Sequence, residues 1–247
     1  MNTFLIIDTY NLLARCKFIA KSGDNWESIG FAMHTLLNSI KWSAKKYQPD
    51  HIVFAIDNGS WRREFYKPYK QNRSAIRAKR TPSEVEKDDL FNAAFNDFIV
   101  FLKEKTNVTV IDQPDCEADD GIALWVQTHS NDKNIIISGD SDFYQLLNEN
   151  TIIYDGVGEK TYTINGVYDN KNKLVINKKT KAPEVIDPEY ELFYKIVRGD
   201  PGDNIFATYP RVRETQILKV FQNREEKGYE WCNFMMSRWT DHNNIEH

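Results

Sequence analysis

Five short acidic clusters contain the side chains of this sequence that are best suited to chemistry. Two are single aspartates that follow short apolar runs, and three are the pairs or triplets in CEADD, SGDSD and GDPGDN. The members are Asp8, Asp57, Glu117, Asp119, Asp120, Asp140, Asp142, Asp200 and Asp203. Each acid alone has an ordinary structural explanation, as a helix N-cap, a turn residue or a first-turn acid that complements the helix dipole. A chemical role can therefore be inferred only from the way the acids are arranged together.

Four short apolar runs predict the buried strands that position these acids. Each is followed by acidic or small polar residues, and the runs are TFLII at 3–7, HIVFAI at 51–56, NVTVI at 107–111 and NIII at 134–137. Between them, apolar residues at three- and four-residue spacing predict helices over about 29–47 and 86–105. Alternating strands and helices are typical of a parallel sheet. The predicted fold class is therefore α/β, with a central, mostly parallel sheet flanked by helices.

The pattern changes after residue 150. The segment TIIYDGVGEKTYTINGVYDNKNKLVI alternates in places and contains turn-forming pairs, which predicts short antiparallel strands or a hairpin. Two or three helices are expected from about Asp187 onward. Segment 74–85 has mixed polarity and no firm apolar period, which is compatible with a mobile loop and equally with an exposed helix.

The predicted sheet brings three of the acids together. Functional groups gather beyond the carboxyl ends of parallel strands, where Asp8, Asp57 and Asp140 are expected to lie. Carboxylates at short range raise one another's pKa unless a cation neutralises them. A metal site resolves this conflict, and carboxylates without paired His or Cys favour Mg²⁺ or Mn²⁺ over zinc.

A strongly basic segment, from Arg62 to Arg80, lies between the second and third predicted strands. Against the single acid Glu64 it carries Arg62, Arg63, Lys67, Lys70, Arg73, Arg77, Lys79 and Arg80, an asymmetry hidden in the net charge of −4. Beside carboxylate-bound Mg²⁺, such cations indicate phosphoryl chemistry, because they neutralise a scissile phosphate while the metal activates water. A solvated charged helix is the alternative. Four aromatic residues are interleaved with the cations and suit either base stacking or the core: Trp61, Phe65, Tyr66 and Tyr69.

Composition limits the class of protein. The 247 residues, 41% of them hydrophobic, suffice for one sizeable core. The first apolar run, Phe4 to Ile7, is too short for a signal peptide, and no run approaches the roughly 20 apolar residues that span a bilayer. Cys16, Cys116 and Cys232 are scattered and suggest neither disulfides nor zinc. A cytoplasmic protein, in a host cytoplasm if viral, is expected.

Five motifs give the sequence a specific resemblance. IIDTYNLL, VFAIDNGSWRREFYKPYKQNR, CEADDGIALWV, IISGDSDFYQLL and IVRGDPGDNI occur in this order over about residues 3–205. They resemble the 5′-nuclease (flap endonuclease) superfamily, and within it the RNase H group of T-even bacteriophages. The resemblance implies a PIN-like 5′-nuclease fold with a catalytic domain at 1–185 and a helical arch at about 70–86. It also implies a helical DNA-binding region at 186–247, either naturally short or truncated.

The resemblance assigns roles to individual residues. It implies two Mg²⁺ ions, for which Mn²⁺ is a substitute, held at a first site by Asp8, Asp57, Glu117, Asp119 and Asp120. The second site would take Asp140, Asp142, Asp200 and Asp203, with Asp120 and Asp140 near both ions. Catalysis is expected from Lys70, Arg73, Asp8 and Asp140. Nucleic-acid contacts are expected from Arg62, Arg63, Lys67, Tyr69, Lys70, Arg73 and Arg77.

The implied activity is that of a 5′-3′ exonuclease, flap endonuclease and RNase H. It would hydrolyse DNA or RNA–DNA duplexes at 5′ ends, leave a 5′-phosphate and a 3′-hydroxyl, and remove RNA primers and flaps in phage-type DNA replication. The substrates would be DNA with 5′ flaps or nicks and RNA–DNA hybrids. Candidate protein partners are a single-strand binding protein, a sliding clamp or a polymerase. A monomer without membrane association is expected.

One motif departs from the family pattern. Most members follow the last acidic pair with a glycine-rich helix–turn–helix that grips duplex DNA, whereas DNIFATYPRVRETQILKVF lacks those glycines. We hypothesise that Arg211 and Arg213 contact phosphates instead, the alternative being ordinary surface arginines. Two alternatives are a non-catalytic nucleic-acid-binding protein on this fold, which predicts lost acids, and a PIN-like endoribonuclease, which usually lacks the arch and second acidic pair.

Overall fold

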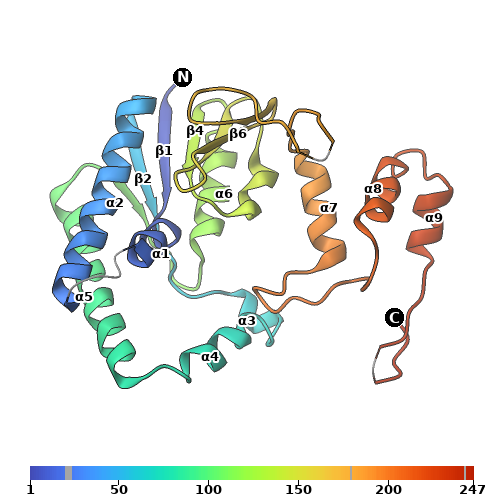
Figure 1. Ribbon diagram of the computed structural model, residues 1–247, viewed down its shortest axis with the longest axis horizontal. Helices are drawn as coiled ribbons and strands as arrows, with labels where there is room; N and C mark the ends of the chain where they lie inside the picture. Colours follow the sequence, from blue (N-terminus) through green and yellow to red (C-terminus); the bar gives the residue numbers. More distant parts are fainter. Residues whose placement is uncertain (20–23, 179, 242) are drawn as a thin grey trace.

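The computed structural model describes residues 1–19, 24–178, 180–241 and 243–247, and within them a seven-stranded sheet forms the centre of the molecule (Figure 1). Its strands are β1 (Thr3–Asp8), β2 (His51–Ala55), β3 (Thr109–Ile111), β4 (Lys133–Ile137), β5 (Thr151–Asp155), β6 (Lys160–Thr163) and β7 (Gly166–Tyr168). The strand order is β3-β2-β1-β4-β5-β6-β7. Strands β3 to β5 in this order are parallel, and only β6 and β7 are antiparallel.

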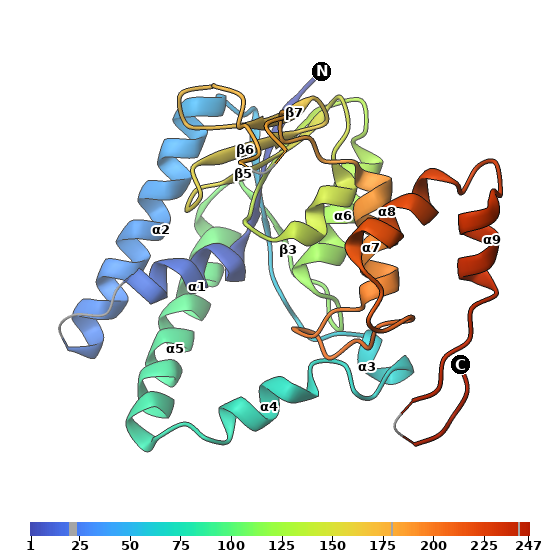
Figure 2. The same cartoon turned by 45° about the vertical axis from the view of Figure 1, so that its right-hand side comes forward.

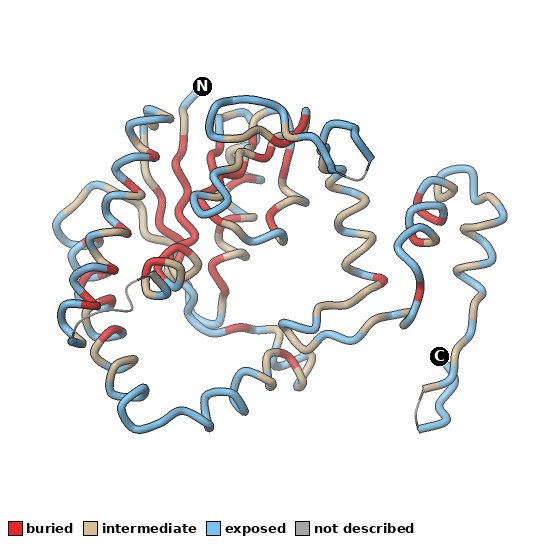
Figure 3. Tube along the Cα trace, viewed as in Figure 1, coloured by how far each residue is buried: buried red, intermediate tan, exposed pale blue. Residues whose placement is uncertain are grey.

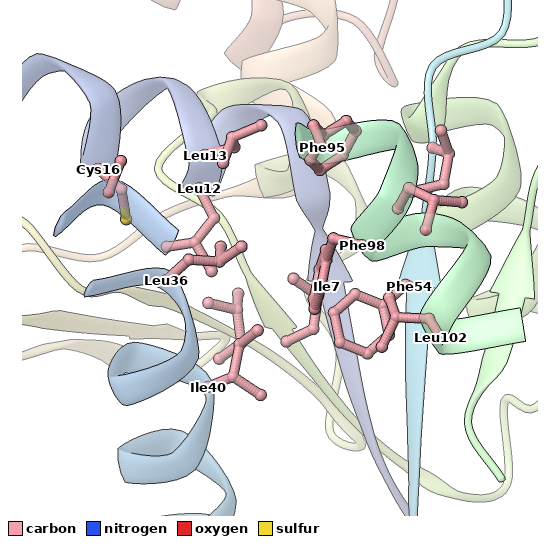
Figure 4. Packing of buried hydrophobic residues seen from close by; sticks show 14 of the residues in the cluster. Ile7, Leu12, Leu13, Cys16, Leu36, Ile40, Phe54, Phe95, Phe98 and Leu102 are labelled. Carbon is pink, nitrogen blue, oxygen red and sulfur yellow. The ribbon is translucent and has the colours of Figure 1, made fainter. Parts of the chain in front are cut away.

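Helices cover both faces of the sheet, which confirms the predicted α/β class. One face packs against α1 (Thr9–Ile19), α2 (Asn25–Tyr47) and α5 (Pro82–Lys105), and the other against α6 (Ala118–Thr128) and the 3₁₀ helix η1 (Ser141–Leu146). Successive residues of β1 alternate between the faces: Leu5 and Ile7 enter the first core and Phe4 and Ile6 the second. Figure 4 shows Ile7 between the aromatic side chains of α5 and the aliphatic side chains of α1 and α2.

The strands predicted from apolar runs are all present, and two details differ from expectation. Helix α5 begins at Pro82, earlier than predicted, because Thr81 and Glu84 form a capping box and proline suits the first helical turn. Strand β5 pairs parallel with β4, so the expected antiparallel pattern holds only for β6 and β7.

The basic segment leaves the sheet as two short helices, α3 (Arg62–Phe65) and α4 (Gln71–Arg77), before the chain enters α5. Figure 2 shows them spanning the space below the strand ends, and the trace of α4 in Figure 3 is largely exposed. Neither helix contains a buried residue. Segment 74–85 is therefore part exposed helix, part connection and part first turn of α5.

The C-terminal part consists of α7 (Pro188–Arg198), α8 (Glu214–Gln222) and α9 (Tyr229–Met235), in agreement with the expected two or three helices. It has a small core of its own, built from Val197, Val212 and Ile217 with surrounding aromatic side chains. Helix α7 also contacts η1 and so joins this part to the sheet.

Two further findings concern the class of protein. Within the described ranges, no helix is both long and apolar enough to cross a lipid bilayer. All three cysteines are free thiols, with Cys16 buried, Cys116 half-buried and Cys232 exposed.

Truncation of Phe95 should show how much the core between the sheet and α1, α2 and α5 contributes to stability. Phe95 is 1% exposed and its ring lies 4.7 Å from that of Tyr10. We expect Phe95→Ala to lower the free energy of unfolding by about 3–5 kcal/mol, since it removes a buried ring and leaves a cavity. Urea denaturation monitored by circular dichroism measures this. The control, Phe101→Ala on the same helix, removes a ring that is 52% exposed and should lower it by about 1 kcal/mol or less. Equal losses would contradict the assignment of the core.

Candidate active site

A cavity of about 1490 Å³ lies between the carboxyl ends of β1, β2 and β4 and the basic segment. Eight of the nine predicted acids line it: Asp8, Asp57, Glu117, Asp119, Asp140, Asp142, Asp200 and Asp203. They come from strand ends, from the start of α6 and η1, and from the turn after α7. The structure thus brings into one cavity acids that are far apart in the sequence. It does not bring Asp120 there, because the Asp120 carboxylate accepts two hydrogen bonds of 2.8 Å from Arg62.

Asp8, at the end of β1, is buried, with an exposure of 7%. Its carboxylate accepts hydrogen bonds from the Ser138 hydroxyl at 2.7 Å and the Asn11 backbone N–H at 3.4 Å. Burial nevertheless raises the pKa of Asp8 to about 7, and Asp57 adds to the rise. The Ser138 hydroxyl also accepts the backbone N–H of Asp140 at 3.1 Å, which couples the ends of β1 and β4.

Two other acids of the cavity also have a raised pKa. Desolvation raises the pKa of Asp119 to about 6, with a further contribution from Glu117. For Asp140, whose side chain opens to the cavity, partial desolvation by the walls raises the pKa and outweighs the opposing effect of Lys195. All three acids therefore carry negative charge at a free-energy cost.

Four of the nine acids are neutralised by cations of this chain. Glu117 accepts from Lys70 Nζ at 2.6 Å, and Asp203 accepts from Arg73 Nη2 at 2.5 Å. Asp142 pairs with Lys195 of α7, and Asp120 pairs with Arg62. In the described part of the chain, no ion pair involves the other five: Asp8, Asp57, Asp119, Asp140 and Asp200.

The donor set fits a hard divalent cation. Carboxylates are prominent among the residues that line the cavity, and burial raises the pKa of Asp8 and of Asp119, with neighbouring carboxylates adding to the rise, so a cation would stabilise their charged forms. Among the residues whose placement is described, no three His, Cys, Asp or Glu side chains converge closely enough to hold an ion. Three of the acids are paired with cations instead: Glu117 with Lys70, Asp203 with Arg73, and Asp142 with Lys195.

The acids also have structural roles. Asp140, rather than Asp142, is the N-cap of η1 and accepts the Asp142 N–H at 2.9 Å. Glu117 and Asp120 form the capping box of α6, and Asp57 accepts the Ala118 N–H at 2.9 Å. The structural explanation offered by the sequence therefore applies to Asp140, Glu117 and Asp120, which cap the helices that begin at the cavity.

The predicted cations divide into paired and unpaired groups. Lys70 and Arg73 lie at the cavity wall, and Lys70 adopts the left-handed conformation with φ 55° while its N–H donates to the Asp203 carbonyl at 2.9 Å. Arg63, Lys67 and Arg77 line the cavity and form no ion pair with any described residue. Arg211 and Arg213 are exposed before α8 and do not line the cavity.

Two of the residues expected to contact nucleic acid make other interactions in this structure. The Arg62 guanidinium is held by the Asp120 carboxylate. Tyr69 cannot stack on a base, because it is 5% exposed and its hydroxyl lies 2.6 Å from Glu117 Oε2 and 3.0 Å from Asp203 Oδ2. The sequence showed an aromatic residue among cations but not the direction of its ring.

Three residues of the site were not predicted. Ser138 stands two positions before Asp140 in a chemistry-bearing motif, so its neighbourhood was a usable signal. Lys195 lines the cavity from α7, and no local pattern links it to Asp142. Asp88 of α5 pairs with Lys17 of α1 and with Arg80, and so fixes the far end of the arch segment.

The chain is an α/β protein with an acidic cavity at the carboxyl ends of its parallel strands. Comparison with known sequences gives its family. Residues 3–179 match the model of the 5′-3′ exonuclease, N-terminal resolvase-like domain. The chain therefore belongs to this family, which confirms the predicted resemblance.

Two curated relatives and two solved structures illustrate the match. The flap endonuclease Xni of Psychromonas ingrahamii is 34% identical over 161 residues, and the ribonuclease H of Enterobacteria phage T4 is 32% identical over 195 residues. These alignments cover 63% and 75% of this chain and 57% of either relative, so the chain spans little more than half of their length.

The bacteriophage T5 D15 protein co-crystallised with metal ions superposes with a TM-score of 0.69 at 23% identity, over 90% of this chain and 74% of that chain. A complex of the T5 D15 flap endonuclease with DNA and metal ions gives a TM-score of 0.69 at 22% identity, over 95% and 79% of the two chains. At this identity the likeness shows the fold.

The raised pKa of Asp8 leads to a stability prediction for the metal-free protein. Its folded pKa of about 7 exceeds the ordinary 3.8, so the stabilisation by the neutral form is complete below about pH 4 and is lost as the pH rises through 7. Asp8→Asn removes the charge while it can still accept from Ser138. In EDTA at pH 8 its Tm should exceed that of the parent by roughly 3–8 °C.

The Tm difference between Asp8→Asn and the parent should shrink as the pH falls toward 4. The matched control is Asp97→Asn on the exposed side of α5, which should leave Tm unchanged at every pH. A variant that melts below the parent at pH 8 would show that the Asp8 carboxylate stabilises the metal-free fold, against this account.

Proposed function

We propose that this chain is a Mg²⁺-dependent 5′-nuclease with 5′-3′ exonuclease, flap endonuclease and RNase H activity. The observation that carries the proposal is that unneutralised carboxylates and unpaired arch cations line the same cavity. Support comes from relatives named flap endonuclease and ribonuclease H, and from the T5 structure that contains DNA and metal ions. The substrates would be DNA with 5′ flaps or nicks and RNA–DNA hybrids.

Two Mg²⁺ ions, with Mn²⁺ as a substitute, would be held mainly by the five acids that lack an ion pair: Asp8, Asp57, Asp119, Asp140 and Asp200. Bound Mg²⁺ supplies Lewis-acid activation of water and neutralises charge on the phosphate. Glu117, Asp142 and Asp203 join this set when Lys70, Lys195 and Arg73 release them. Asp120 would act indirectly, through its capping box with Glu117.

The cations of the chain would position the substrate. Phosphate oxygens that enter the cavity compete with Glu117 and Asp203 for Lys70 and Arg73, the two cations nearest the acids. Arg63, Lys67 and Arg77 need no such exchange, because they are unpaired among the described residues. A single strand that enters the cavity would thus meet the unpaired cations first, and Lys70 and Arg73 at the reacting phosphate.

The two predicted regions would share the work. Residues 1–185 would supply the catalytic domain and 186–247 the second nucleic-acid contact, yet Lys195, Asp200 and Asp203 from the latter line the cavity. The proposed setting is removal of RNA primers and flaps in phage-type replication in a cytoplasm, with a single-strand binding protein, sliding clamp or polymerase as partner.

A cleavage assay tests the function. With Mg²⁺, the parent should cut 5′-labelled flap, nicked and RNA–DNA substrates, and Asp140→Asn should cut them about 100-fold or more slowly, because charge stabilisation at the phosphate is lost. Asp97→Asn, on the exposed side of α5, should cut at the parental rate. A parent that cuts none of the three substrates, or an Asp140→Asn variant as fast as the parent, would overturn the proposal.

The unpaired arch cations should determine the salt dependence of binding. Replacing Arg63, Lys67 and Arg77 with alanine should reduce the slope of log affinity against log salt by roughly 2, since each neutralised phosphate releases counterions. Fluorescence anisotropy with Ca²⁺ in place of Mg²⁺ measures it. Alanine at the exposed Lys171 and Lys173, remote in sequence from the cavity residues, removes the same kind of charge and should leave the slope unchanged.

The same titration tests Arg211 and Arg213. If they replace the missing glycine-rich grip, Arg211→Ala with Arg213→Ala should lower the slope for a duplex by roughly 1.5. The slope for a single strand should not change. An unchanged duplex slope would refute phosphate contact by this pair.

A further inference from the structure

The four aromatic residues among the arch cations fall into two groups. Tyr69 is buried, and the Tyr66 hydroxyl donates to the Asn204 carbonyl at 3.3 Å, so both belong to the packing of the site. Trp61 and Phe65 instead face solvent, with exposures of 44% and 81%. Their ring centroids are 5.6 Å apart at 81°, an edge-to-face pair. An exposed aromatic pair is the informative observation, because a folded chain gains by burying such rings.

The position of Trp61 is fixed by its surroundings. Its backbone N–H donates to the Asp115 carbonyl at 2.7 Å. The Arg62 guanidinium lies 4.9 Å from the Trp61 ring centre and is itself held by the Asp120 carboxylate. A ring with so few remaining rotamers can bind a partner without a large loss of conformational entropy.

The charge around the pair selects the partner. Arg63 and Lys67 stand two positions to either side of Phe65, line the cavity, and form no ion pair within the described ranges. Exposed aromatic rings near unpaired cations suit a single-stranded nucleic acid, because its bases can stack on the rings and its phosphates can pair with the cations. A protein partner would instead need acidic groups and an apolar patch together.

We propose that Trp61 and Phe65 form a stacking platform for one unpaired nucleobase of the strand that enters the cavity. Phe65 offers the exposed ring face, and Trp61 supports its edge. Arg63 and Lys67 hold the phosphates on both sides of that base. The proposal rests on the proposed function for its substrate class, and it adds a position at which the strand is gripped by a base rather than by a phosphate.

The test combines a protein variant with a DNA variant. Binding of a 5′ single-stranded overhang is measured with Ca²⁺, with one abasic site moved through each position of the overhang. Phe65→Ala should weaken binding of the intact strand about 5- to 50-fold, and Phe65→Tyr should restore it to within about twofold. For the parent, one abasic position should cost a similar factor. That position should cost Phe65→Ala nothing more, because the stacking contact is already lost.

Two controls separate the platform from general effects. Phe101→Ala removes another exposed phenylalanine ring, 52% exposed on α5, and should bind the overhang like the parent. Phe65→Ala should keep the parental Tm, because its ring packs against little. The proposal is overturned if Phe65→Ala binds the overhang as tightly as the parent does. It is also overturned if the abasic position that weakens binding by the parent weakens binding by Phe65→Ala by the same factor.

Failure of the platform is distinguishable from failure of the nuclease. Binding in Ca²⁺ requires no cleavage, so a parent that binds with one abasic-sensitive position but never cuts in Mg²⁺ keeps the platform and loses the nuclease. A parent that cuts normally while Phe65→Ala binds normally keeps the nuclease and loses the platform.

Discussion

The partial burial of several carboxylates at the carboxyl edge of the sheet is the constraint on which the site depends. The parallel order of β2, β1 and β4 places Asp57, Asp8 and Asp140 beside one another, whatever the cost in charge. Burial of Asp8 makes that cost larger, as its raised pKa shows. A fold selected for stability alone would place neutral side chains there, so the retained charge indicates a binding role for cations. The strands themselves are secure, because both faces of β1 lie in apolar cores.

The surrounding elements are arranged by this charge. Lys70 and Arg73 reach the acids from the arch, Arg62 from α3 and Lys195 from α7. These ion pairs attach the arch to the start of α6 and to the turn after α7, α3 to α6, and α7 to η1. Helices α3 and α4 have no buried residue, which leaves charge and hydrogen bonds as their main attachment. Such contacts are weaker than apolar packing and exchange readily with phosphate oxygens. The part of the molecule that faces a substrate is thus also the part that is most easily rearranged.

The sequence predicted most of the fold because its signals are local. The runs that became β1, β2 and β4 end beside Asp8, Asp57 and Asp140, and parallel pairing then places these acids at one edge. The direction of a side chain is decided by tertiary contacts, which the sequence does not show: Tyr69 is turned inward by Glu117 and Asp203, and Asp120 is turned toward Arg62. Lys195 could not be predicted, since only the packing of α7 on η1 brings it to Asp142.

The arch segment is held at both ends and little in between. At one end Lys70 is fixed by its left-handed backbone and by Asp203, and at the other Arg80 and Lys17 meet on Asp88. A doubling of the length between two fixed ends costs only about 0.6 kcal/mol of closure entropy. Insertions and deletions between Arg73 and Arg80 can therefore change the width of the aperture without moving Asp8 or Asp140. In the proposed nuclease, the opening that admits a strand and the acids that act on it would be free to evolve separately.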